Sequence, residues 1–217
     1  MLAISDLNVA IKRTTVLRGV GLKIADGSFV TLAGRNGAGK TTLMRSVMGL
    51  LPVQSGTIEM DGAILNQEPD YRRVTRGIGY MPEGRRLIGQ WTVEQNILLP
   101  LKAMNRRDYA DELRRVYDFI PELHELTGRR ASTLSGGQQK LVALARALVC
   151  GSKLLLLDEP FEGIAPALAV RLTEILSHIR REKGRSVLLS ESDFVHSDSL
   201  VDDVFLIERG EVTHHPR

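Results

Sequence analysis

A glycine-rich segment near the N-terminus carries the most specific chemical pattern in this sequence. Residues 34–42 read Gly-Arg-Asn-Gly-Ala-Gly-Lys-Thr-Thr and fit the phosphate-binding pattern G-x-x-x-x-G-K-[ST] in full. Glycines allow the backbone angles that turn successive N–H groups inward, and a following helix offers its positive N-terminus to the same anion. The segment therefore predicts a nucleotide phosphate site made by Gly34, Asn36, Gly37, Ala38, Gly39, Lys40, Thr41 and Thr42.

The last three residues of this loop carry different functional groups. We expect the Lys40 ammonium to reach the β- and γ-phosphates of a nucleoside triphosphate. The Thr41 hydroxyl is expected to bind Mg²⁺, and Thr42 to support the α-phosphate. A glycine-rich turn that binds nothing is the alternative, and it is disfavoured because an apolar strand precedes the loop and a helical pattern follows it.

Two adjacent carboxylates end an apolar run later in the chain. Residues 154–157 are all leucine, which is typical of a strand buried on both faces, and Asp158 and Glu159 follow directly. Ligands bind at the carboxyl ends of strands in open parallel sheets, so both acids are expected beside the phosphate loop. Neighbouring strand residues point to opposite faces, so the two acids can differ in role. We expect Asp158 to hold Mg²⁺ and Glu159 to polarise the attacking water as the catalytic base.

The elements that must position these groups alternate between strand and helix. Apolar patterns and turn residues predict strands at 2–9, 16–24, 28–33, 57–60, 63–65, 78–81, 154–157, 186–190 and 204–207. Helical spacing predicts helices at 39–48, 109–120 and 166–183. This order implies an α/β fold with a mainly parallel sheet and helices on its faces.

The stretch from residue 91 to residue 150 is expected to be helical and to form an insert, because strand patterns stand on either side of it. We therefore expect one domain over residues 1–217. Its nucleotide-binding core, with the N-terminal β strands, would comprise residues 1–90 and 151–217, and its helical subdomain residues 91–150.

The composition fits one folded domain and excludes several classes of protein. The chain has 217 residues, 43% of them apolar, and a net charge of +3, so the charge balance gives no indication of nucleic-acid binding. Its one cysteine, Cys150, excludes a disulfide framework and fits a reducing compartment. The start lacks the pattern of a signal peptide, and no apolar run reaches the ~18 residues of a membrane span. Any membrane role is therefore expected to come through a partner.

A second glycine pair opens the helix expected to end near residue 150. Residues 134–139 read Leu-Ser-Gly-Gly-Gln-Gln, which by itself could be a serine-capped, anion-binding helix start. The string resembles the signature of the ATP-binding cassette (ABC) family, and the resemblance covers essentially the whole chain. It implies a P-loop NTPase (RecA-like) fold: a mainly parallel sheet core, an N-terminal antiparallel β subdomain and an inserted helical subdomain. It also implies that Ser135, Gly137 and Gln138 bind ATP held by a second subunit in a head-to-tail dimer.

A closer resemblance lies in residues 79–87, Gly-Tyr-Met-Pro-Glu-Gly-Arg-Arg-Leu, and in residues 158–166. Both look like the ATP-binding subunits of branched-chain amino acid importers. Most cassettes have a glutamine that senses Mg²⁺ and water where this sequence has Glu83, so the resemblance implies a catalytic and metal-site role for Glu83. Residues 83–96 would contact the cytoplasmic helices of the membrane subunit.

The function implied is the ATP-binding and ATP-hydrolysing subunit of an importer for branched-chain amino acids or related small polar solutes. The implied partners are ABC permease membrane subunits, a second cassette that is identical or different, and indirectly a periplasmic or extracellular binding protein. The expected location is the cytoplasmic face of the inner (plasma) membrane, as a peripheral protein. Two alternatives stay open: a soluble or catalytically weak cassette that binds ATP and regulates assembly, and an export-type ATPase.

Three residues depart from the family pattern. Ile11 stands where most cassettes have an aromatic residue that stacks on adenine, so we expect weaker or less selective adenine binding. Ser192 stands where most have a histidine that contacts the γ-phosphate, and it is expected to reach phosphate through water; an alternative alignment would use His196. Phe161 replaces a serine that is usual in the subgroup, and we expect it to affect the dimer seam.

Overall fold

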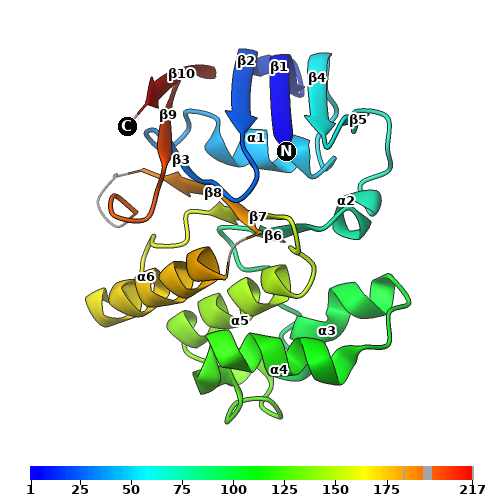
Figure 1. The fold of residues 1–217 in the computed structure, drawn as a ribbon, viewed down its shortest axis with the longest axis vertical. Coiled ribbons are helices and arrows are strands. Elements are labelled where there is room, and N and C mark those ends of the chain that lie inside the picture. The colour runs from blue at the N-terminus through cyan, green and yellow to red at the C-terminus, as the bar shows by residue number, and fades with distance from the viewer. Residues whose placement is uncertain (183, 193–196, 217) are drawn as a thin grey trace.

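The strands of the protein form two sheets, as the computed structural model of residues 1–182, 184–192 and 197–216 shows (Figure 1). The first sheet is antiparallel with the order β2-β1-β4-β5. Its strands are β1 (Leu2–Ile11), β2 (Thr14–Ile24), β4 (Ser55–Met60) and β5 (Ala63–Ile64). Asp61 and Gly62, both at positive φ, make the tight turn between β4 and β5.

The second sheet has six strands in the order β10-β9-β3-β8-β7-β6. Neighbouring strands are parallel except for β10, which pairs antiparallel with β9 at one edge. The strands are β3 (Phe29–Ala33), β6 (Ile78–Met81), β7 (Leu154–Asp158), β8 (Ser186–Glu191), β9 (Asp203–Glu208) and β10 (Glu211–Pro216). The interior position of β7 and β8 explains the apolar runs at residues 154–157 and 187–189, because both strands are buried on two faces.

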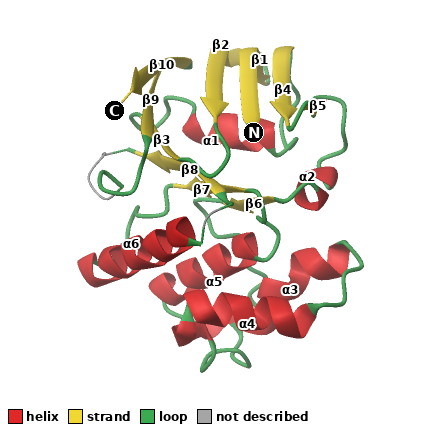
Figure 2. Cartoon of the chain, in the orientation of Figure 1, coloured by secondary structure: helices red, strands yellow, loops and turns green. Residues whose placement is uncertain are grey.

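The helices lie on both faces of the six-stranded sheet (Figure 2). One of them, α1 (Lys40–Val47), lies between the two sheets. The others lie to the side or below: α2 (Arg72–Thr75), α3 (Val93–Ala103), α4 (Tyr109–Phe119), α5 (Gly136–Leu148) and α6 (Pro166–Arg181), with short 3₁₀ turns at Pro121–Leu123 and Ala131–Thr133. Within the described residues, no helix has the length and apolar character needed to cross a membrane.

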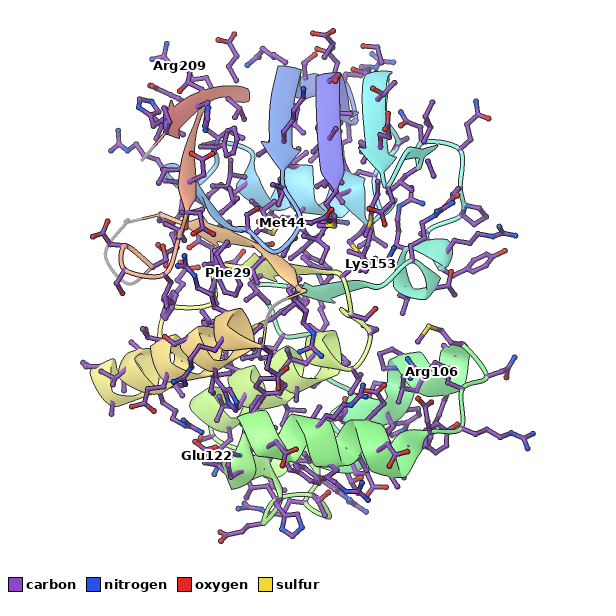
Figure 3. All side chains as sticks on the ribbon, viewed as in Figure 1. Phe29, Met44, Arg106, Glu122, Lys153 and Arg209 are labelled. Carbon is purple, nitrogen blue, oxygen red and sulfur yellow. The ribbon has the colours of Figure 1, made fainter. Side chains whose placement is uncertain are left out.

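Two apolar clusters hold these layers together, one on each face of the six-stranded sheet. Leu154 and Leu156 of β7 belong to the cluster that lies above the six-stranded sheet in Figure 1, the upper cluster, with α1 and the antiparallel sheet. Leu155 and Leu157 belong to the lower cluster, with α3 to α6. In Figure 3, Met44 and Phe29 mark the upper and lower clusters. This alternation along β7 predicts that Asp158, which continues the upper series, points toward α1.

The turn between β9 and β10 connects the antiparallel sheet to the phosphate loop. The Arg18 N–H donates to the Gly210 carbonyl at 2.8 Å, and the Gly210 N–H donates to the Ala38 carbonyl at 3.0 Å. A Cβ atom on Gly210 would overlap the Val16 carbonyl oxygen, so only glycine allows this approach. The antiparallel sheet is thereby fixed against the base of the phosphate loop.

The expected α/β fold class, with an antiparallel β subdomain and a mainly parallel sheet, is confirmed. The expected strands are all present within one to two residues of their observed ends, and the helix expected over 166–183 ends at Arg181. Residue 183 lies outside the described residues. The sequence reasoning missed β10, because His214, His215 and Pro216 give it the polar pattern of an exposed edge.

Candidate functional site

The glycine-rich loop connects β3 to α1 and opens a cavity of about 470 Å³. Gly37 and Gly39 have φ angles of 83° and 120°, and Gly39 is the N-cap of α1. That is the backbone the loop needs to direct its N–H groups at an anion. The cavity is lined by Val16, Asn36, Gly37, Gly39, Lys40, Thr41, Thr42, Glu83 and Glu159. The structure therefore brings most of the predicted phosphate-site residues together around one space of ligand size.

Gly34 and Ala38, which were also predicted for the phosphate site, do not line this cavity. Gly34 is buried at the base of the loop, where its carbonyl accepts a hydrogen bond from the Lys40 ammonium. Ala38 accepts from Gly210 and donates its own N–H to the Arg35 carbonyl at 3.0 Å. Both residues therefore support the loop through contacts outside the cavity.

The Lys40 ammonium lies at the centre of the site, and the side chain is only 5% exposed. Its Nζ lies 2.9 Å from Oε1 of Glu159 and 3.2 Å from Oγ of Ser192. It also donates to the Arg35 carbonyl at 3.2 Å. A phosphate that approaches this ammonium must compete with the Glu159 carboxylate for it.

The Asp158 carboxylate lies on the α1 side of the sheet, as the alternation along β7 predicts. Oδ1 accepts from the Thr41 hydroxyl at 3.1 Å and from the Ser190 hydroxyl at 2.8 Å. Oδ2 accepts from the Tyr80 hydroxyl at 3.1 Å. Burial raises the pKa of Asp158, while these three hydrogen bonds act in the opposite direction.

Thr41 and Asp158 form an oxygen pair that fits a magnesium ion. Mg²⁺ is commonly bound by one or two protein oxygens, several waters and substrate phosphates. The hydroxyl and the carboxylate lie within hydrogen-bond distance of each other, and Thr41 also lines the phosphate cavity. Their direct contact marks a place where a small cation could bind to both oxygens and to a phosphate.

Glu159 directs its carboxylate into the cavity from a strained backbone position. Its φ of 48° is in the left-handed region, which costs a non-glycine residue about 1 kcal/mol or more. Ser190 and Ser192 hold it there: the Glu159 N–H donates to the Ser190 hydroxyl at 3.0 Å, and Ser192 donates to the Glu159 carboxylate from Oγ at 2.7 Å and from N at 3.2 Å. A carboxylate so placed can accept a proton from a water beside a γ-phosphate.

Ser192 connects three parts of the site. Its hydroxyl lies 2.7 Å from Oδ1 of Asn36 in the phosphate loop and accepts from Lys40 at 3.2 Å, in addition to its contact with Glu159. The hydroxyl has one proton, so it can donate to only one of the two acceptors at a time. His196, from the alternative alignment, lies outside the described residues.

Glu83 reaches the same cavity from the loop after β6. It lines both the phosphate cavity and a neighbouring cavity of about 420 Å³ that includes Arg86 and Asp158. Burial is the largest cause that raises the pKa of Glu83, followed by the charges of Glu162, Asp158 and Glu159.

The loop that carries Glu83 is fixed to α5. Arg85 and Arg86 have φ angles of 60° and 52°, and Arg146 of α5 donates to their carbonyls at 2.6 Å and 2.8 Å. Arg85 in turn donates to the Gln139 side chain at 3.2 Å. The position of Glu83 is therefore linked to the helix that follows the second glycine pair.

The residues of that second glycine pair lie in a different part of the molecule. Ser135 is the N-cap of α5 and forms a capping box with Gln138, in which each side chain accepts from the other residue's N–H at 3.2 Å and 3.0 Å. With Gly137 they line a cavity of about 790 Å³ beside Gly163 and Leu168. Among the described residues, none lines both this cavity and the phosphate cavity. Within one chain, the structure does not bring Ser135 and Gly137 to Lys40.

Ile11 and Phe161, two of the three residues that depart from the family pattern, have positions that the sequence alone could not predict. Ile11 ends β1 with 40% of its surface exposed, and Val16, not Ile11, lines the phosphate cavity. Phe161 is buried in the lower apolar cluster. Since its ring packs inside the chain, any effect on a dimer seam would be indirect.

Sequence reasoning missed three residues that shape the site: Tyr80, Ser190 and Lys140. Ser190 pairs with Asp158 in the parallel register of β8 and β7, and Tyr80 pairs with Leu156 across β6 and β7. Comparing the ends of the predicted strands could have found Ser190, had the strand order been known. Lys140, which donates to the Glu159 carbonyl, lies in an apolar helix and belongs to no motif that the sequence analysis recognised.

Comparisons with known proteins concern the family and the fold of the chain. Residues 17–162 match the family model described as ABC transporter. The chain is 35% identical to the high-affinity branched-chain amino acid transport ATP-binding protein BraG of Pseudomonas aeruginosa, over 99% of this chain and 92% of that protein. It is 32% identical to the lipopolysaccharide export system ATP-binding protein LptB of Escherichia coli, over 99% and 89%. The dimeric structure of a bacterial ABC transporter cassette, MJ0796, superposes with a TM-score of 0.89 at 23% identity, over 100% of this chain and 98% of that one.

Proposed function

Because the chain belongs to the ABC transporter family and is an ATP hydrolase coupled to transport, we propose that the cavity around Lys40 is where it hydrolyses ATP. The observation that carries this assignment is that Glu159 lines the cavity of the phosphate loop beside Lys40, while Asp158 contacts Thr41 of the same loop. Asn36, Gly37, Gly39 and Thr42 hold the phosphates through the loop backbone and side chains, and Gly34 and Ala38 support the loop from outside the cavity. Lys40 binds the β- and γ-phosphates.

The hydrolytic step depends on residues that surround the γ-phosphate position. Glu159 accepts a proton from the attacking water, and Ser192 orients the Glu159 carboxylate by its two hydrogen bonds. Mg²⁺ bound at Thr41 and Asp158 would neutralise phosphate charge, and Glu83 would hold a water beside it. The inward-turned loop N–H groups and Lys40 stabilise the charge that develops on the phosphate oxygens.

The test of this assignment is Glu159→Gln, which keeps the shape of the side chain and removes the base. We expect it to retain binding of mant-ATP and to lose turnover by a factor on the order of 10² or more. Phosphate release with Mg-ATP measures this, with Glu211→Gln on the exposed edge strand as the matched control. Phosphate release by Glu159→Gln at the wild-type rate would rule out Glu159 as the base.

A second cassette completes each ATP site in this proposal. Ser135, Gly137 and Gln138 form an anion-binding helix start in a cavity separate from Lys40. A head-to-tail pair would bring this helix start of one chain to the γ-phosphate held by the other. The helical subdomain, residues 91–150, would carry the helix start, and residues 1–90 and 151–217 would form the nucleotide-binding core.

The transporter is proposed to be an importer for branched-chain amino acids or related small polar solutes. The similarity to BraG over nearly the whole chain supports it, as does the motif at residues 79–87. In this role the cassette binds permease subunits at the cytoplasmic face of the membrane, through residues 83–96, and a periplasmic or extracellular binding protein delivers the solute. Deletion of the gene should lower uptake of radiolabelled leucine, and wild type but not Glu159→Gln should restore it.

An export-type transporter is the second candidate, because LptB is similar at nearly the same identity. Unchanged uptake of leucine, isoleucine and valine in the deletion strain would contradict the importer and favour export.

A further inference from the structure

A buried amine on α5 contacts the turn that carries the proposed base. Lys140 is the fifth residue of α5 and is only 2% exposed. Its Nζ donates to the main-chain carbonyl of Glu159 at 3.1 Å and to that of Glu162 at 2.6 Å. Lys140 does not line the phosphate cavity. Burial of a lysine ammonium is unfavourable unless hydrogen bonds replace the water that it loses. The two contacts supply such hydrogen bonds, and both are made to one turn.

The turn that Lys140 holds determines where the Glu159 side chain points. It runs from Glu159, with its φ of 48°, to Glu162, whose N–H donates to the Glu159 carbonyl at 3.2 Å. A left-handed residue such as Glu159 persists only where its surroundings over-determine it. The ammonium of Lys140 bridges both ends of the turn and is the contact that α5 supplies.

We propose that Lys140 is a positioning residue for ATP hydrolysis, which holds the Glu159–Glu162 turn so that the Glu159 carboxylate faces the attacking water. This inference rests on the proposed role of Glu159. Because Lys140 lies one turn after Gly136, it also connects the start of α5, which would face the partner's nucleotide, to Glu159, the proposed catalytic base of its own chain. Movement of α5 would then reach Glu159 directly.

The charges around the amine make this contact sensitive to pH. Arg85 faces it from the loop after β6, together with Glu83, while Glu159 and Glu162 face it from the turn. Burial, followed by the charge of Arg85, lowers the pKa of Lys140 to about 8. Hydrogen bonds from the charged amine are about twice as strong as those from a neutral one. The hold on the turn should therefore weaken as pH rises above about 8.

The experiment compares Lys140→Met, which keeps the length and removes the donors, with Lys140→Gln, which keeps two N–H donors without charge. For Lys140→Met we expect kcat to fall by about tenfold to a hundredfold, because misplacing a reacting group by about 1 Å has an effect of that order. The mant-ATP Kd should stay within about twofold, since the side chain is outside the cavity. Lys102→Met, an exposed lysine on α3, is the matched control.

For Lys140→Gln we expect kcat near the wild-type value at pH 7 and no fall between pH 7.5 and 9.5, where the wild-type kcat declines. This variant also decides the question if Lys140→Met fails to fold. Unchanged kcat in Lys140→Met, or an alkaline decline in Lys140→Gln equal to that of wild type, would overturn the proposal. If Glu159→Gln hydrolyses ATP normally, the role of Glu159 itself fails, whatever the Lys140 variants show.

Discussion

At the scale of single residues, the ion pair between Lys40 and Glu159 governs access to the site. The two groups lie 2.9 Å apart and both are nearly buried, so each satisfies the other when no phosphate is present. ATP must replace the Glu159 carboxylate as the partner of the ammonium. Its γ-phosphate must also approach the negative charge of that carboxylate. The group proposed to drive hydrolysis therefore opposes binding of the substrate.

This competition predicts that Glu159→Gln binds ATP more tightly than wild type, by a factor on the order of ten. The amide cannot hold the ammonium as a counter-charge, and it removes the repulsion between carboxylate and γ-phosphate. Titration of mant-ATP without Mg²⁺, so that no turnover occurs, measures the difference. Equal or weaker binding by Glu159→Gln would show that the ion pair does not compete with phosphate.

Glu191, one residue before Ser192, gives a prediction on stability. Its side chain is buried, Oε2 accepts from Ser197 at 2.7 Å, and Oε1 has no hydrogen-bond partner among the described residues. Burial raises the pKa of Glu191 from 4.5 to about 7. The folded chain then keeps a proton that the unfolded chain has released, so stability must fall as pH rises between these two values.

Glu191→Gln removes this titration. Relative to wild type, its free energy of unfolding should rise between pH 5 and pH 8, by up to about 3 kcal/mol. Urea denaturation at four pH values tests this, with Glu211→Gln as an exposed control that should follow wild type. Parallel pH profiles for Glu191→Gln and wild type would contradict the buried, raised-pKa carboxyl.

At the scale of elements, local patterns explain what could be predicted. The phosphate loop and the acids after β7 are encoded in consecutive residues, since the loop needs its glycines and β7 needs leucines on both faces. Ser190 and Tyr80 reach Asp158 only because β8 and β6 flank β7 in the sheet. Strand order is a property of the whole chain, so no local pattern could reveal these contacts.

The junction of the two sheets at Gly210 is also an element-scale feature that can be tested. Gly210 and Gly62 have φ angles of 83° and 79°, but a Cβ would overlap the Val16 carbonyl only at Gly210 and would meet nothing within 4 Å at Gly62. Both substitutions to alanine cost about 1 kcal/mol for the left-handed backbone. Gly210→Ala should cost at least about 2 kcal/mol more, because the sheets must separate.

Urea denaturation of the two alanine variants separates these contributions. The strain common to both positions cancels in the comparison, and the remainder reports the contact between β2 and the turn before β10. Equal losses of stability in Gly210→Ala and Gly62→Ala would mean that the junction is not tightly packed.

At the scale of the whole molecule, the proposed function divides each ATP site between two chains. Lys40 and Glu159 line one cavity, and Asp158 contacts Thr41 at its edge, while Ser135 and Gly137 line another cavity. Sequence reasoning predicted both sets of residues and, by resemblance, their separation between two subunits. It could not place Ile11 outside the cavity or Phe161 in the core, because both positions depend on tertiary packing.

The most direct test of this arrangement is sedimentation of Glu159→Gln with ATP, since blocked hydrolysis should trap the closed pair. We predict a dimer of about 48 kDa, twice the chain mass of 24.0 kDa, and a monomer without ATP. Adding Ser135→Arg should abolish the dimer while mant-ATP binding persists. A monomer in Glu159→Gln with saturating ATP, or an undiminished dimer when Ser135→Arg is added, would contradict the proposal that two cassettes complete each other's ATP sites.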